Sequence, residues 1–378
     1  MKIFHISDLH LGKRLNEFSL LEDQRHILRE ILLLAESRRP DLLILAGDLY
    51  DKSIPAVEAV SMLDDFLSAF VRLGIPVCAI SGNHDSPDRI DFGSRIFARS
   101  GVYLSCVYQG RLVQADFQDA YGPVHVFLLP FVRPADVRPF FPDRKIDGYP
   151  AAMEAALSSP LPDPAERNLL VTHQFVLGAS RCDSEEVNIG GTDGVPADLF
   201  RAYDYVALGH LHAPQAVGRA ELRYSGSPLK YSFSEASQTK SVTEVVLEEK
   251  GSVRISELPL RPLRDLKRIR GRFEELSQKC FYDGTEFREC YLDIILTDEQ
   301  DVPDALQKLR LIYPYIMHLG YDNRRTRQTG RPELPESEEE LPAEELIREF
   351  YRQQNGQELT SEQAALLAEI LEETEAEP

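Results

Sequence analysis

The sequence predicts a layered α/β fold, in which two packed sheets are flanked by helices, followed by a small α+β domain and a helical C-terminal tail. Over the first part of the chain, short apolar runs bounded by turn residues alternate with amphipathic helical segments, a pattern typical of βαβ units. The pattern then changes to shorter strands and helices, and later to a polar, acidic stretch. The length of 378 residues suits about two or three domains.

The helices and strands of the first domain follow from this alternation. Apolar residues at helical spacing predict a helix over residues 19–38 and another over 55–74. Pro55 suits a first helical turn, and Gly74 suits a helix end. Five predicted strands have apolar bodies and polar ends: 2–7, 41–46, 76–81, 168–173 and 204–209. Three further runs are expected to complete a second sheet packed on the first: 124–130, 222–228 and 242–249.

Changes in composition divide the chain into four segments. Strands and helices at short spacing over 262–320 indicate a small α+β unit, and the tail carries apolar residues at helical spacing on both sides of a break at Asn355. The tail helices could pack on their own domains, but the linker before them favours docking onto a partner helix. The predicted segments are a core domain over 1–258, an α+β domain over 259–325, an acidic linker over 326–340 and a helix-loop-helix over 341–378.

Composition excludes several classes of protein. No apolar run approaches the ~20 residues of a membrane span, and the N-terminus lacks the apolar region of a signal peptide. We therefore expect a cytoplasmic protein with no membrane contact. None of the five cysteines shares C-x-x-C spacing with another, which argues against a disulfide framework and a structural zinc site. Any metal ion is expected to have nitrogen and oxygen ligands.

The net charge of −20 does not exclude a nucleic-acid substrate, because the acidic residues are unevenly placed. Residues 331–378 contain fifteen acidic and three basic side chains, and therefore supply most of the net charge. Residues 261–272 contain six Lys or Arg and a single Asp. This local basic run could contact a phosphate backbone, although a solvated surface is an equally good explanation.

Each of the five polar-ended strands is followed by side chains able to bind a metal ion. The carboxyl ends of strands in α/β sheets gather at one edge, so all five are expected to converge there. Residues two apart in an extended chain point to the same side, and Gly47, Gly82 and Gly209 allow tight turns beside a metal. Two carboxylates, one amide and four imidazoles suit two cations about 3.5 to 4 Å apart. These candidate ligands are Asp8, His10, Asp48, Asn83, His173, His210 and His212.

The ordered motifs DLH, GDLYD, GNHD, THQ and GHLH resemble the calcineurin-like metallophosphoesterase superfamily. With EDQRH, GGTDGVPADLF and YSGSPLKYSFSE, residues 1 to about 325 are similar to the bacterial SbcD family of nuclease subunits, which process DNA ends and hairpins. The resemblance implies a first metal held by Asp8, His10, Asp48 and His212. It implies a second metal held by Asp48, Asn83, His173 and His210, with Asp48 bridging the two. Nitrogen and oxygen ligands favour Mn²⁺, with Fe and Zn as alternatives.

The same resemblance implies roles for the residues beside these ligands. His84 is expected to lie near the metals without binding them and to assist the departing sugar oxygen as a general acid. Asp51 is the first candidate to orient the His84 imidazole, and Asp85 is the second. The implied reaction is hydrolysis of a phosphodiester by an activated water molecule, with no covalent enzyme intermediate.

The resemblance also implies partners. In the family, the nuclease subunit is a homodimer within a heterotetramer and works with SbcC, an SMC-like ATPase with a long coiled coil. The helical tail is the natural candidate to bind that coiled coil, and the helices of the first domain to form the dimer. DNA, the expected substrate, could also contact Arg324, Arg325 and Arg327. The resemblance implies double-strand exonuclease and single-strand or hairpin endonuclease activity in DNA replication, recombination and repair.

Two other functions remain possible from the sequence. A stand-alone phosphatase or cyclic-nucleotide phosphodiesterase could use the same metal ligands, although the added domain and tail argue against it. A catalytically silent scaffold is the second alternative. The presence of all seven candidate ligands argues against a silent site.

Overall fold

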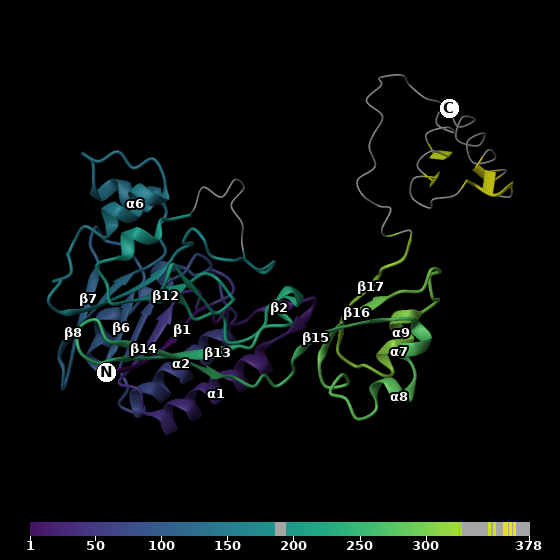
Figure 1. Ribbon diagram of the computed structural model, residues 1–378, viewed down its shortest axis with the longest axis horizontal. Helices are drawn as coiled ribbons and strands as arrows, with labels where there is room; N and C mark the ends of the chain where they lie inside the picture. The colour runs from purple at the N-terminus through teal and green to yellow at the C-terminus, as the bar shows by residue number, and fades with distance from the viewer. Residues whose placement is uncertain are drawn as a thin grey trace, which may run out of the picture. The chain divides into compact units, whose positions relative to one another are not determined.

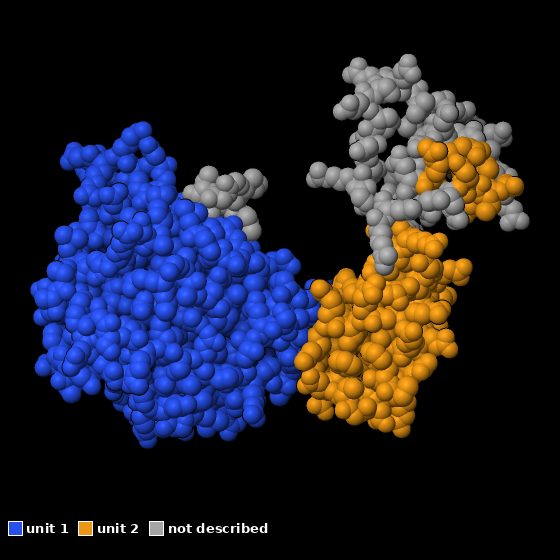
Figure 2. Space-filling view, viewed as in Figure 1, with its two compact units in different colours: residues 1–266 blue, residues 267–378 orange. Residues whose placement is uncertain are grey.

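The structure is a computed structural model. It describes residues 1–185, 194–324, 326, 347–348, 351–352, 358–361, 363–364 and 366–367. The chain divides into two compact units, residues 1–266 and residues 267–378 (Figure 2). The predicted linker and most of the predicted tail lie outside the described residues.

The first sheet of unit 1 has the strand order β14-β13-β1-β4-β5-β6. Its central strands are parallel to one another, and β13 joins antiparallel to β1. All five residues of β4 are buried, as expected for a parallel strand covered on both faces. The strands are β1 (Lys2–Ile6), β4 (Leu42–Ala46), β5 (Val77–Ile80), β6 (Val102–Ser105), β13 (Ser241–Leu247) and β14 (Val253–Pro259).

Two long helices, α1 (Leu21–Arg38) and α2 (Val57–Arg72), contact each other and follow the strands β1 and β4 in the chain (Figure 1). Both helices bury one apolar stripe, which includes Ile31 in α1 and Phe66 in α2. The two predicted helices are confirmed, but α2 begins at Val57 because Ala56, the residue before it, is extended.

The second sheet has the order β11-β12-β10-β9-β8-β7. Its four middle strands run parallel, and both edge strands are antiparallel. Apolar side chains from both sheets form a shared core, which includes Ile44, Val126, Val171 and Tyr205. The strands are β7 (Val113–Asp119), β8 (Gly122–Leu129), β9 (Arg167–His173), β10 (Tyr205–Gly209), β11 (Gln215–Val217) and β12 (Arg219–Tyr224).

One predicted strand lies in the other sheet. The run 242–249 was expected in the second sheet, but it forms β13 of the first sheet, where Val245 is paired with Ile3. Alternating apolar residues predict a strand and its buried face, but they do not specify its partner. The five metal-type strand ends likewise come from two sheets, three from the first and two from the second.

Short elements lie in the connections between the strands of unit 1. The α-helical ones are α3 (Pro87–Asp91), α4 (Ser94–Phe97), α5 (Pro134–Val137) and α6 (Tyr149–Ala156). The 3₁₀ turns are η1 (Ala98–Ser100), η2 (Arg138–Phe140), η3 (Ala197–Phe200) and η4 (Phe233–Glu235), and the small hairpin is β2 (Arg14–Leu15) with β3 (Phe18–Ser19). The α6 helix buries Met153 in a second core on the other face of the β9 sheet.

Unit 2 has the mixed helix and strand content that its sequence predicts. Its sheet has the order β15-β16-β17 and covers a core that includes Leu292, Leu309 and Tyr313. The elements are β15 (Leu266–Gly271), α7 (Phe273–Leu276), α8 (Lys279–Tyr282), β16 (Tyr291–Leu296), α9 (Ala305–Arg310) and β17 (Ile316–Tyr321). Within the described part of the chain, no helix is both long and apolar enough to span a membrane.

Candidate metal centre

The candidate ligands lie at the carboxyl ends of β1, β4, β5, β9 and β10 or on the loops that follow them, and the structure brings all seven together. Four of them, Asp8, His10, Asp48 and His210, have positive φ angles, a conformation that costs free energy for residues other than glycine. Backbone bonds hold these loops to one another: the Asp8 amide donates to Gly47 O at 3.0 Å, and the His10 amide donates to Asp48 O at 2.9 Å. Four of the candidate ligands therefore adopt strained backbone conformations where the ligand side chains converge.

The first group of ligands contains Asp8, His10 and His212, whose ligand atoms all lie within 4.8 Å of one another. The Nε2 atoms of His10 and His212 are 3.1 Å apart, and His10 Nε2 is 3.6 Å from Asp48 Oδ2. Asp8 also accepts a hydrogen bond from the His210 amide at 3.0 Å. All of these side chains except that of His210 are almost fully buried.

The second group contains Asn83, His173 and His210, with Asp48 beside them. The Asn83 Oδ1 atom lies 3.0 Å from His173 Nε2 and 3.0 Å from His210 Nδ1. His173 Nε2 is also 3.3 Å from Asp48 Oδ2, and its other ring nitrogen is 2.8 Å from Ala46 O. The same Asp48 oxygen thus faces imidazoles of both groups, which is the arrangement expected for a bridging carboxylate.

Gly47, Gly82 and Gly209 have no space for a side chain beside the ligands. A Cβ atom at Gly82 would lie 2.1 Å from Asp48 Oδ1, and one at Gly209 would lie 1.9 Å from Ala46 O. Since real Cβ atoms do not approach other atoms so closely, alanine at either position would displace a ligand loop.

Burial and the two buried carboxylates set the charge of the centre. Burial raises the pKa of Asp8. Burial acts in the same direction on Asp48, but His173 and His10 outweigh it and lower the pKa of Asp48 well below its ordinary value. Burial lowers the pKa of His210 to about 3 and that of His10 well below 6.5. These two imidazoles are therefore neutral at pH 7, the form that binds a metal ion.

His84 lies at the edge of this cluster. Its ring is edge-on to the His10 ring, with centroids 4.8 Å apart, and its backbone amide donates to Asp48 Oδ1 at 2.9 Å. Its Nδ1 atom lies 3.2 Å from the main-chain oxygen of Asp51. The Asp51 carboxylate instead pairs with Lys13, at 2.7 Å. Asp51 thus contacts His84 through its backbone.

Asp85, the second candidate to orient His84, has a carboxylate that bonds to the backbone of two loops. It accepts hydrogen bonds from the amides of Leu49, Tyr50 and Gly82, at 3.1, 2.9 and 2.9 Å. Burial and the nearby Asp48 raise the pKa of Asp85 to about 6. Asp85 therefore fastens the loop after β4 to the loop after β5.

Sequence reasoning missed the polar side chains behind His212. Ser184 and Glu235 approach its Nδ1 atom, and Glu185 accepts a hydrogen bond from its amide at 2.7 Å. Burial alone would raise the pKa of Glu235, but His212 and Lys240 lower it to about 2. The motif YSGSPLKYSFSE contains Glu235, and this residue, the one acidic side chain of the motif, was the available signal.

The donor atoms of this cluster fit divalent metal ions. Nitrogen and oxygen atoms of the kind that bind metal ions lie about 3 Å apart, around two buried carboxylates. A cation held among them would offset the cost of burying these carboxylates. The described residues include no sulfur ligand in these groups, which suits hard or borderline ions.

Comparisons with known proteins show the family to which the chain belongs. A family model described as calcineurin-like phosphoesterase matches residues 1–214, more than half of the chain. The chain therefore belongs to the calcineurin-like phosphoesterases, and divalent metal ions are the cofactors that this class and the clustered ligands support. A dimetal phosphatase from Danio rerio aligns with a TM-score of 0.40 and 12% identity, over 69% of this chain and 96% of that one.

Within that class, the chain belongs to the SbcD nuclease family. It is 34% identical over 378 residues to the SbcD subunit of the nuclease SbcCD from Staphylococcus epidermidis, with 98% of each chain covered. The corresponding SbcCD nuclease subunit of Staphylococcus saprophyticus is 33% identical over 380 residues, with the same coverage. A model described as type 5 capsule protein repressor C-terminal domain matches residues 262–355. These matches confirm the resemblance seen in the sequence.

Proposed function

We propose that this chain is a metal-dependent DNA nuclease that cleaves double-stranded ends as an exonuclease and single strands or hairpins as an endonuclease. We propose that it acts with an SbcC-like ATPase in DNA end processing during replication, recombination and repair. The observation that carries the proposal is the convergence of seven metal-type ligands and His84 at the edge of two sheets, in a chain of the SbcD family.

The ligands divide into two sets that share one carboxylate. We assign Asp8, His10, Asp48 and His212 to the first cation, and Asp48, Asn83, His173 and His210 to the second, with Mn²⁺ as the preferred ion. When bound, the two cations would neutralise phosphate charge and make a water molecule more acidic. The protein contributes a fixed, buried frame of ligands, so little reorganisation is needed when the substrate binds.

His84 is the residue proposed to handle the leaving group. With Nδ1 directed at the Asp51 carbonyl, a protonated imidazole would keep its other N–H for the departing sugar oxygen. General acid help of this kind contributes about 10²- to 10⁴-fold in rate. Asp51 is a positioning residue in this proposal, acting through its main-chain oxygen.

The remaining segments are assigned to partners. Residues 1–258 would form the nuclease domain, and 259–325 a capping domain that contacts DNA. Four basic residues of the run 261–272 pair with carboxylates, which neutralises part of its charge: Arg264, Lys267, Arg268 and Arg270. Residues 326–340 would be a linker, and 341–378 would bind the SbcC coiled coil.

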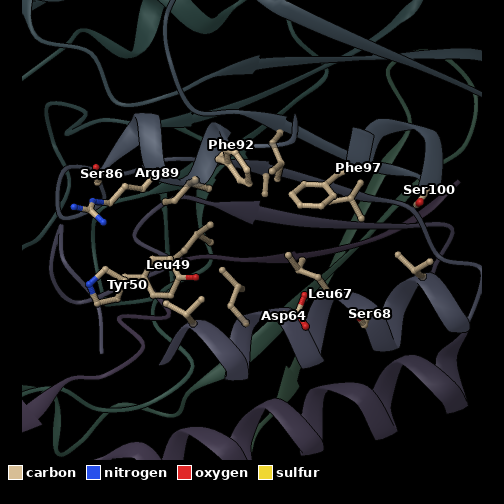
Figure 3. A pocket seen from close by; sticks show the side chains of 18 of the residues that line it. Leu49, Tyr50, Asp64, Leu67, Ser68, Ser86, Arg89, Phe92, Phe97 and Ser100 are labelled. Atoms are coloured by element: carbon tan, nitrogen blue, oxygen red, sulfur yellow. The ribbon is translucent and has the colours of Figure 1, made fainter. Parts of the chain in front are cut away.

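A homodimer is proposed through an apolar groove of about 920 Å³ between α2 and the α3–α4 segment. Figure 3 shows Phe92 and Phe97 on one wall and Leu67 on the other. Phe92 is 83% exposed and Phe97 is 43% exposed. Large exposed apolar side chains gathered in one place are typical of protein interfaces, and a second copy would bury them.

The test is hydrolysis of a labelled DNA duplex with one hairpin end, by the purified chain in Mn²⁺, with and without SbcC and ATP. Asp48→Asn should abolish cleavage. Asp23→Asn changes another buried aspartate, on α1, and should retain it. Cleavage of a small phosphodiester with DNA left intact would instead identify a stand-alone phosphodiesterase. If the wild-type protein binds metal but hydrolyses neither DNA nor the small phosphodiester, it is a catalytically silent scaffold.

A further inference from the structure

A network of polar groups leads from the buried Lys240 to the imidazole of His212. Lys240 Nζ is 2.5 Å from Glu235 Oε2, and the other Glu235 oxygen accepts a hydrogen bond from Ser184 Oγ at 2.6 Å. Ser184 Oγ is in turn 2.8 Å from His212 Nδ1. Glu235 is fully buried, Lys240 is 5% exposed and Ser184 is half-buried, so the charged pair of this network is shielded from solvent.

The order of hydrogen-bond donors and acceptors in this network determines which ring nitrogen of His212 carries the proton. Glu235 is paired with an ammonium group and is an acceptor only. The Ser184 hydroxyl hydrogen must therefore point at Glu235, which leaves a lone pair of Ser184 facing His212. That lone pair needs a donor, so His212 carries its proton on Nδ1. Its Nε2 atom then presents a lone pair toward His10 and the metal centre.

Both backbone polar groups of His212, its carbonyl and its amide, are hydrogen-bonded to neighbouring charged side chains. Lys240 Nζ donates to the His212 carbonyl at 2.7 Å and lies 3.0 Å from Ser227 Oγ. The Glu185 carboxylate accepts from the His212 amide. The ring and the main chain of this residue are thus both fixed by groups that lie outside the ligand set.

We propose that Glu235, with Ser184 and Lys240, is a positioning residue that locks His212 as the Nδ1–H tautomer and aims its Nε2 at the first cation. This inference rests on the proposed function in one respect, since it takes His212 to be a metal ligand. Groups that orient metal-bound imidazoles in this way typically change metal affinity or activity by about 10- to 100-fold.

Calorimetric titration of the full chain with Mn²⁺ tests the proposal without any substrate. Glu235→Gln keeps the size of the side chain but removes its charge, and should weaken one Mn²⁺ site by about 10-fold or more while leaving the other. Glu244→Gln is the matched control, because Glu244 is a buried glutamate on β13 that bonds to Ser256. Unchanged affinity of both sites in Glu235→Gln would overturn the proposal.

A second pair of variants separates positioning from a general effect on folding. Ser184→Ala removes the bridging hydroxyl and should lower the affinity of the same site, whereas Ser184→Thr keeps a hydroxyl and should restore it. Nitrogen-15 NMR of His212 in the metal-free protein should show a protonated Nδ1 in the wild type. A protonated Nε2 there would refute the proposal.

DNA cleavage is measured in parallel to distinguish the two proposals. If Glu235→Gln binds Mn²⁺ more weakly but the wild-type protein leaves DNA intact, the positioning role is supported and the proposed nuclease activity is refuted. If the wild-type protein cleaves DNA and Glu235→Gln binds Mn²⁺ as tightly as the wild type does, the nuclease activity is supported and the positioning role is refuted.

Discussion

Asp85→Ala is predicted to destabilise unit 1 strongly, although Asp85 is not among the candidate ligands. Its carboxylate accepts three backbone hydrogen bonds, from Leu49, Tyr50 and Gly82, and its side chain is buried. A buried N–H group left without a partner costs about 1–3 kcal/mol, so three such groups would cost about 3–9 kcal/mol. Substitution also relieves repulsion from the nearby Asp48, and the expected loss is therefore at the lower end, about 3–4 kcal/mol.

The assay is urea unfolding of the metal-free chain, followed by circular dichroism and analysed by linear extrapolation. Asp136→Ala is the matched control, because Asp136 is exposed and accepts one backbone hydrogen bond from Arg133 at 2.8 Å. The control should lose about 0.5–1.5 kcal/mol, the contribution of one ordinary hydrogen bond. Hydrogen exchange at the Leu49, Tyr50 and Gly82 amides should accelerate in Asp85→Ala. A loss no larger than that of Asp136→Ala, with these amides still protected, would refute the role assigned to Asp85.

Four further predictions follow from other parts of the molecule. His84→Ala should retain both Mn²⁺ sites by calorimetry while its cleavage rate falls at least ~10-fold; loss of both metals would make His84 structural. Burial lowers the pKa of His5 to about 3 from 6.5, so the unfolded state binds the proton first and stability falls as the pH drops below 6.5. Between pH 7 and pH 5 the wild type should lose about 2 kcal/mol more than His5→Gln in urea unfolding, and equal losses would contradict this. Phe92→Asp with Phe97→Asp should yield a monomer in sedimentation experiments, and an intact dimer would exclude the groove. Deleting 335–378 should abolish SbcC binding in a pull-down but leave Mn²⁺-dependent cleavage, and unchanged complex formation would refute the docking role.

The sequence by itself determined the metal-type strand ends and the class of fold. Period-two alternation and short apolar runs identify strands because they reflect local geometry, and the side chains after each strand are adjacent in the chain. The two-residue spacing of Asp8 with His10, and of His210 with His212, therefore predicted directly that each pair points to the same side. The role of Gly82 and Gly209 could also be predicted from the sequence, because a tight turn beside a crowded site needs a residue without a Cβ atom.

The tertiary structure decided which strands pair and which polar groups meet. Residues 241–247 form β13 beside β1, more than 200 positions away in the chain, and no local pattern encodes such a pairing. The same limit applies to side chains: Asp51 contacts His84 through its backbone, and Asp85 holds two loops together. Glu235 approaches His212 only because η4 and the loop after β10 are folded against each other. Hydrogen bonds need donor and acceptor within about 3 Å, and that proximity is set by the packing of the whole unit.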